Sequence, residues 1–176
     1  MDNRFCVRTF SDFVKGHKLK LDKEPSVGAI LDAATDLSRY KEVVFCGYGE
    51  PTTRLDVLKE VATALKKENK KIRVVTNGHG NLINKRPIAK ELAGLVDAVS
   101  VSLNAETESK YNAICKPEFG AKTYNAILDF IKACVKNSIE TEVTCVEVEG
   151  IDVKKCEGIA KSLGASFRLR SFGAVG

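Results

Sequence analysis

Residues 43–53, VVFCGYGEPTT, place a carboxylate in a tight turn directly after a buried strand. The apolar run at 43–45 predicts the strand, because a short apolar run bounded by glycines is typical of a strand buried on both faces. Gly47 and Gly49 let the backbone approach a ligand closely. Glu50 is then placed to accept an ammonium group, with nearby carbonyls completing the hydrogen bonds. The alternative is an ordinary turn between a strand and a helix.

Polar, glycine-rich or charged residues also follow the other predicted strands. They are residues 76–81 (TNGHGN), 102–104, 147–149 and 168–170. Because parallel strands of an α/β fold end at one edge of the sheet, these residues predict a ligand site rather than generic turns.

Arg168 and Arg170 lie two residues apart and therefore share one face of a strand. Two arginines inside a barrel call for an anion, such as a cofactor carboxylate or a substrate acid. The alternative is internal pairing with Glu147 or Asp97.

Histidine and cysteine offer little further chemistry. His79 is interpreted as an ordinary loop residue, although it is also a candidate proton relay or metal ligand. With two histidines in the chain, a histidine-rich metal site is excluded. The cysteines are scattered, without a C-x-x-C pair, and Cys134, Cys145 and Cys156 are predicted core residues. Cys115 is placed in a loop, where a structural role is favoured over a hydrogen-atom donor or a ligand of a second cluster.

Helices and strands must alternate to position these residues. Apolar spacing predicts helices at 27–37, 55–65, 86–93, 121–137 and 153–163, and strands at 42–46, 71–76, 97–103, 139–147 and 166–172. Ser26, Asp152 and a capping box of Thr53 and Asp56 are the predicted helix starts. Residues 7–25 are predicted as a loop. Residues 104–120 form a connection long enough to favour a substrate-covering role.

Five strands separated by helices imply parallel pairing with right-handed crossovers. Two architectures fit this order, an open doubly wound sheet and part of a β/α barrel. Neither a linker nor a low-complexity stretch divides the chain, so one domain is expected.

Composition excludes some classes of protein. The 28 basic and 23 acidic residues give a net charge of +5, and the lysine-rich stretches lie at predicted helix ends. A solvated surface is therefore favoured over nucleic-acid binding. No apolar run approaches a membrane span, and the first residues lack the apolar core of a secretory signal. A cytoplasmic location is expected, without a membrane partner.

The turn GYGEPT at residues 47–52 resembles the G-G-E-P motif of radical S-adenosylmethionine (radical SAM) enzymes, with Tyr48 in place of the first glycine. More specifically, FCGYGEPT at 45–52 followed by TNGHGN at 76–81 resembles the TatD-associated radical SAM group. The resemblance covers nearly the full chain, through SVSLNA at 100–105, CKP at 115–117 and RLR at 168–170.

This resemblance implies a single radical SAM core domain over residues 1–176, folded as a partial (β/α)6 TIM-like barrel that lacks its first strand. It implies an enzyme that binds a [4Fe–4S] cluster and S-adenosylmethionine and generates a 5′-deoxyadenosyl radical, which acts on an unknown substrate. An electron donor such as flavodoxin or ferredoxin is the implied partner.

The resemblance also implies roles for individual residues. Cys6 ligates the cluster, Phe5 packs near the adenine, and Glu50 accepts the methionine amino group. Ser102 and Asn104 face the ribose or the carboxylate. The remaining implied cofactor-binding residues are Gly47, Tyr48, Gly49, Pro51, Asn77, Arg168 and Arg170.

The sequence departs from the family at its start. The cluster motif C-x-x-x-C-x-x-C has its third cysteine at Cys6, but its second position is Asn3 and its first falls before Met1. A member shortened at the N-terminus is therefore expected, with an incomplete metal site. A missing strand also predicts low solubility, because it exposes a sheet edge and an apolar barrel wall. The alternatives are a cluster-less, non-catalytic binding module and an unrelated β/α-barrel lyase that uses Glu50 and a phosphate site.

Overall fold

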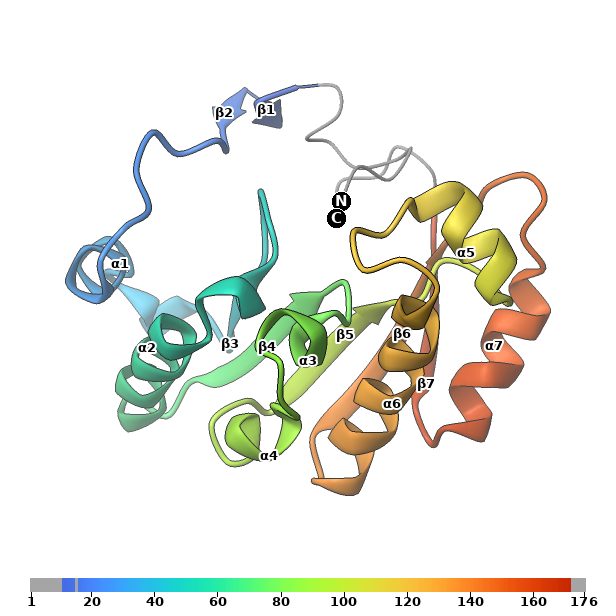
Figure 1. Cartoon of the computed structure of the whole chain (residues 1–176). Coiled ribbons are helices and arrows are strands. Elements are labelled where there is room, and N and C mark those ends of the chain that lie inside the picture. Colours follow the sequence, from blue (N-terminus) through green and yellow to red (C-terminus); the bar gives the residue numbers. More distant parts are fainter. Residues whose placement is uncertain (1–10, 15, 172–176) are drawn as a thin grey trace.

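The computed structural model describes residues 11–14 and 16–171 of the 176-residue chain (Figure 1). A parallel sheet of five strands lies at its centre: β3 (Glu42–Phe45), β4 (Lys71–Thr76), β5 (Ala98–Ser102), β6 (Glu140–Val146) and β7 (Ser166–Arg170). The strands lie side by side in chain order. A doubly wound sheet reverses its order part-way, so the sequential order favours the barrel alternative. The predicted α/β fold is confirmed.

Helices connect the strands. α2 (Leu55–Lys67) joins β3 to β4, and α3 (Gly80–Ile83) and α4 (Ala89–Leu92) join β4 to β5. α5 (Glu108–Cys115) and α6 (Lys122–Lys136) join β5 to β6, and α7 (Val153–Ser162) joins β6 to β7. Before the sheet come the antiparallel strands β1 (Phe13–Val14) and β2 (His17–Lys18), α1 (Val27–Ala33) and the 3₁₀ turn η2 (Leu37–Arg39); a second 3₁₀ turn, η3 (Pro51–Arg54), precedes α2.

The apolar core lies between the sheet and the helices, which Figure 1 shows around the outside of the sheet. Ile72 and Val74 alternate with less buried residues along β4 and are fully buried, as are Phe130 and Ile131 of α6. They belong to one continuous cluster of buried side chains. Burying each such side chain contributes about 1.5–3 kcal/mol, so this layer stabilises the whole sheet.

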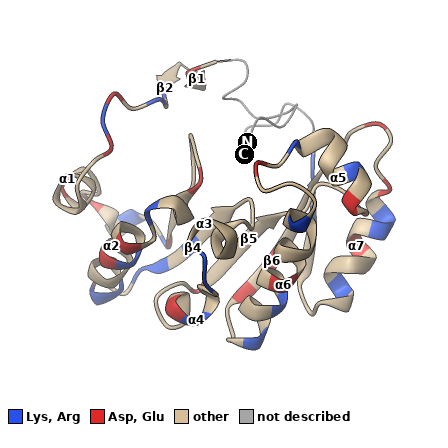
Figure 2. Ribbon diagram, viewed as in Figure 1, with Lys and Arg blue, Asp and Glu red and all other residues tan. Residues whose placement is uncertain are grey.

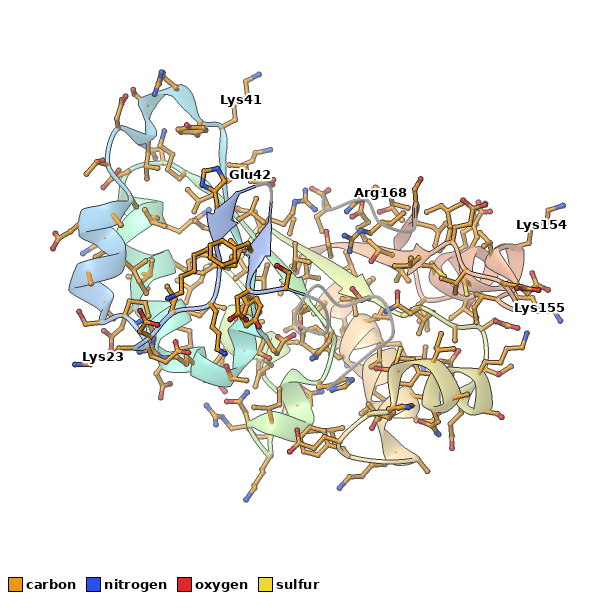
Figure 3. The ribbon with its side chains drawn as sticks, turned by 90° about the horizontal axis from the view of Figure 1, so that it is seen from above. Lys23, Lys41, Glu42, Lys154, Lys155 and Arg168 are labelled. Carbon is orange, nitrogen blue, oxygen red and sulfur yellow. The ribbon has the colours of Figure 1, made fainter. Side chains whose placement is uncertain are left out.

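The opposite face of the sheet carries a line of hydrogen-bonded polar side chains. Arg73 Nε donates to both carboxylate oxygens of Glu42 at 3.1 Å, and Arg73 Nη1 donates to Ser100 Oγ at 3.4 Å. Ser100 Oγ donates to Glu142 Oε1 at 2.9 Å, which also accepts from Arg168 Nε at 3.0 Å. These five residues, here named the charge ladder, cross all five strands; Figure 3 labels the outer members Glu42 and Arg168.

Two of the three predicted helix starts are confirmed. Ser26 and Asp152 each accept a hydrogen bond from a backbone amide of the helix that follows. The capping box of Thr53 and Asp56 is wrong. Thr53 lies inside η3 and its hydroxyl donates to the Glu50 carbonyl at 2.7 Å, while the Glu50 side chain caps η3.

The two segments predicted without regular structure contain some. Residues 7–25 include the β1–β2 hairpin, and residues 104–120 include α5, whose start is capped by the Thr107 side chain. The helix predicted at 27–37 ends at Ala33, and Asp36, with a left-handed φ of 49°, separates it from η2.

The surface agrees with a mild net charge. Figure 2 shows basic and acidic residues together on α2 and on α7. In the part of the chain that the structure describes, no helix combines the length and the apolar character that a membrane crossing requires.

Candidate functional site

The turn after β3 is built on two glycines with positive φ. Gly47 has φ +121° and Gly49 has φ +145°, and the Gly49 amide donates to the Gly47 carbonyl at 3.1 Å. This bond closes a three-residue turn around Tyr48. A Cβ at either glycine would meet no atom within 4 Å, so the backbone conformation, and not a lack of space, requires glycine here.

Glu50 joins the ends of two neighbouring strands. Its Oε1 accepts from the Thr52 amide at 3.1 Å, the Thr52 hydroxyl at 2.7 Å and the Thr76 hydroxyl at 2.8 Å. Its Oε2 accepts from the Asn77 amide at 2.8 Å. Because Thr76 ends β4 and Pro51 begins η3, one carboxylate ties the β3 turn to the carboxyl end of β4.

This geometry gives Glu50 a structural role that the sequence did not indicate. A carboxylate has about four acceptor sites, two on each oxygen. Oε1 is fully used, whereas Oε2 accepts one described bond and has capacity for a further donor. The carboxylate lies at the predicted edge of the sheet and remains chemically suited to an ammonium group.

The loop after β4 is tightly constrained. Asn77 Oδ1 accepts from the His79 amide at 2.8 Å, and the Gly78 amide donates to Thr76 Oγ1 at 3.0 Å. Gly78 has φ +78°, and a Cβ there would lie 3.0 Å from Val101 and Ile127. Both conformation and space therefore require glycine at this position. The loop holds the Asn77 backbone in place to donate to Glu50.

His79 lies in the loop after β4, as interpreted from the sequence, but its side chain is buried in the core. Its side chain is 2% exposed, and Nε2 lies 2.8 Å from the hydroxyl of Tyr111 on α5. The rings of Tyr111 and Phe119 also pack against it edge-on. Burial lowers the pKa of His79 to about 4, so the imidazole is neutral at pH 7. The pair anchors α5 to the loop after β4.

The end of β5 contributes Ser102 and Asn104, as predicted. Ser102 is half-buried, while Asn104 is 3% exposed and adopts a left-handed φ of 61°. The Asn104 Oδ1 atom is buried and has no described hydrogen-bond partner. An unpaired buried acceptor is costly and rare in native proteins. This atom is therefore a second candidate for contact with a ligand donor.

Cys115 lies in the core and not in a loop. It is the last residue of α5 and is fully buried. Burial raises the pKa of its thiol to about 12, although a hydrogen bond with the Asn104 side chain acts to lower this pKa. The reactive thiolate form is therefore suppressed. This agrees with the favoured structural role. Cys134, Cys145 and Cys156 are also fully buried, which confirms their assignment to the core.

Arg168 pairs internally, but with neither predicted partner. Its Nε and Nη2 lie 3.0 and 2.9 Å from Glu142 Oε1 within the charge ladder. Asp97 instead binds Lys66. Arg170 lies one step further along the same strand face, where its carbonyl accepts from the Glu147 amide at 2.8 Å.

The predicted site residues from position 47 onward thus lie at the carboxyl ends of the strands. The exception is Arg168, which lies within β7. It adds Asp12, which the sequence did not indicate and whose carboxylate contacts the Tyr48 hydroxyl. The predicted residues Phe5 and Cys6 lie outside the described residues. Within 11–14 and 16–171, no three histidine, cysteine, aspartate or glutamate side chains are grouped to hold a metal ion.

Residues 4–163 match the radical SAM superfamily. The chain belongs to this superfamily. No curated protein matches the chain. The predicted assignment to the TatD-associated group stays a prediction.

Two solved structures resemble this radical SAM chain. "Structure of TYW1 with a lysine-pyruvate adduct bound" has 20% identity and a TM-score of 0.59, and the match covers 84% of this chain and 49% of that one. A radical SAM methyltransferase from Sphaerobacter thermophilus has 16% identity and a TM-score of 0.54, with 86% and 59% covered. At these identities the likeness concerns the fold. This chain spans about half of the length of these two proteins.

Proposed function

We propose that this chain is the S-adenosylmethionine-binding core of a radical SAM enzyme acting on an unidentified substrate. The observation that carries the proposal is the turn around Glu50. In a chain of this superfamily, the turn holds a carboxylate with spare acceptor capacity at the carboxyl ends of two parallel strands. Ligands of α/β folds bind at this edge.

The chain's own residues fit the amino-acid end of S-adenosylmethionine. Glu50 Oε2 accepts a hydrogen bond from the ligand's ammonium group, and the positive-φ backbone at Gly47 and Gly49 allows the ligand to approach. Asn104 Oδ1 offers an unpaired acceptor, and Ser102 offers a hydroxyl at the end of β5. With a reduced [4Fe–4S] cluster bound beside it, S-adenosylmethionine would supply a 5′-deoxyadenosyl radical.

The described residues do not fit the cluster in the same way. They contain no grouped set of metal ligands, and the predicted ligand Cys6 lies outside them. Cluster binding, the electron donor and the cytoplasmic location remain part of the proposal.

Binding of S-adenosylmethionine by Glu50→Gln tests the ammonium contact. Glutamine keeps the size of the side chain but replaces one acceptor oxygen with a donor, so we expect affinity to fall about tenfold or more. Isothermal titration of the full chain measures it. The matched control is Glu60→Gln on the exposed face of α2, which should bind as the wild type does.

A second ligand separates loss of this contact from loss of folding. 5′-Methylthioadenosine lacks the amino-acid group, so Glu50→Gln should bind it with wild-type affinity. Two outcomes would contradict the assigned role of Glu50. One is that Glu50→Gln and Glu60→Gln bind S-adenosylmethionine equally well, and the other is that Glu50→Gln loses affinity equally for S-adenosylmethionine and for 5′-methylthioadenosine.

Anaerobic reconstitution with iron and sulfide tests the cluster. We expect an iron–sulfur absorption in the wild type and, after one-electron reduction with dithionite, an electron paramagnetic resonance signal, and Cys6→Ser should weaken both. S-adenosylmethionine binding without any such signal would instead support the alternative, a cluster-less binding module.

A further inference from the structure

Tyr48 connects the candidate ligand turn to a distant hairpin. Its hydroxyl donates to Asp12 Oδ1 at 2.7 Å across 36 positions of sequence. Tyr48 is the central residue of the three-residue turn, at the position where the resembled motif has glycine. A hydrogen bond from a hydroxyl to a carboxylate is stronger than one between neutral groups. The side chain that departs from the motif therefore makes a specific contact.

Asp12 holds the hairpin as well as the tyrosine. Its carbonyl accepts from the Leu19 amide at 2.8 Å, which closes the hairpin beyond β1 and β2. Its Oδ2 lies 3.6 Å from Lys20 Nζ. Asp12 is therefore fixed to the backbone of the hairpin on one side and to the ligand turn on the other.

The hairpin has little packing of its own. Phe13 is 54% exposed and Leu21 60% exposed, and both His17 and Lys18 of β2 are exposed. An isolated two-stranded hairpin is marginally stable at best in water. Among the hairpin contacts that the structure describes, the bond between Tyr48 and Asp12 spans the largest distance in sequence, so it is the contact best placed to hold the hairpin near the ligand turn.

The hairpin lies on the functional side of the sheet. Figure 1 shows β1 and β2 beyond the carboxyl ends of the strands, and the connection from β3 to α2 reaches towards them. We propose that Tyr48 is a positioning residue that fastens the described hairpin residues 12–14 and 16–20 as a lid over the candidate site. The bond from Tyr48 to the hairpin is present in the chain without a ligand. Only the effect of the lid on the release of a ligand rests on the proposed function.

Hydrogen exchange of the free, full chain tests the fastening. Tyr48→Phe removes the hydroxyl and keeps the ring, so the Leu19 amide should exchange about tenfold faster, as loss of one charge-assisted bond predicts. Amides of β4 and β5 should exchange as in the wild type. The control is Tyr40→Phe, which alters an exposed tyrosine outside the hairpin. Equal exchange of Leu19 in both variants would overturn the proposal.

A double-mutant cycle tests whether the two side chains act as a pair. In the Asp12→Ala background, Tyr48→Phe should accelerate Leu19 exchange no further, because the acceptor is already absent. Additive effects would show that Tyr48 acts elsewhere, and the proposal would fail.

Ligand kinetics distinguish a lid from a merely structural contact. Tyr48→Phe should raise the dissociation rate of S-adenosylmethionine several-fold while leaving the melting temperature within about 2 °C of the wild type. An unchanged dissociation rate with faster Leu19 exchange would reject the lid and retain the hydrogen bond alone. If the wild type binds no S-adenosylmethionine, the proposed function fails, and Leu19 exchange alone then decides whether Tyr48 fastens the hairpin.

Discussion

Glu50 and His79 illustrate how single polar residues organise the carboxyl edge of the sheet. Glu50 accepts four hydrogen bonds from the turns after β3 and β4, and His79 connects the second of these turns to Tyr111. Both side chains first hold the loops in place. Ligand contact is an additional role that the remaining acceptor capacity of Glu50 permits.

The buried imidazole of His79 predicts a pH dependence of stability. Burial lowers its pKa from 6.5 to about 4, so the unfolded chain binds the proton more tightly than the folded one. Stability is full above pH 6.5 and is lost as pH falls towards 4. Between pH 7 and pH 5 the free energy of unfolding should decrease by about 2 kcal/mol from this residue. Urea unfolding at a series of pH values measures it.

The control for this prediction is the second histidine. His79→Gln should flatten the dependence between pH 6.5 and 5, whereas His17→Gln, at an exposed position, should leave it as in the wild type. If the free energy of unfolding of His79→Gln depended on pH as steeply as that of the wild type, other groups would be responsible for the pH dependence.

At the scale of elements, the charge ladder links strands that the apolar core supports from the other face. Glu142 of β6 accepts from Ser100 of β5 and from Arg168 of β7. Burial alone raises the pKa of Glu142, but these hydrogen bonds outweigh it and the pKa is lowered. The carboxylate thus stays charged at neutral pH and joins three strands.

Removing this carboxylate should weaken the sheet. Glu142→Ala leaves Ser100 without its acceptor and Arg168 without its partner, so we expect a loss of about 1–2 kcal/mol of unfolding free energy. Glu140→Ala is the matched control, because this neighbouring glutamate is 70% exposed and lies 3.6 Å from Arg73; its effect should stay below about 0.5 kcal/mol. Equal losses in denaturant titrations would contradict the role of the ladder.

At the scale of the whole molecule, the two outer strands are exposed. Val44 of β3 is 42% exposed and Leu169 of β7 is 41% exposed, and β3 has one described strand neighbour, β4. Open edges with apolar side chains promote association between chains. The expectation of low solubility made from the sequence remains a prediction.

A charge on the outer strand should suppress this association. Val44→Lys should weaken self-association about tenfold in sedimentation velocity experiments across a range of concentrations, because edge lysines oppose strand pairing. Leu21→Lys replaces an apolar residue outside the sheet that is more exposed, at 60%, and should have no effect. A wild type that is monomeric at every concentration would contradict the prediction.

The sequence by itself determined the order of the five sheet strands and of the longer helices between them, the parallel sheet and the glycine–glutamate turn after β3. These features follow from apolar periodicity and turn residues, which act over a few neighbouring positions. Only the tertiary structure decided the partners: Glu142 for Arg168, 26 positions away, Tyr111 for His79, 32 positions away, and Asp12 for Tyr48, 36 positions away. Such contacts depend on strand register and on how helices pack, and local spacing does not encode either.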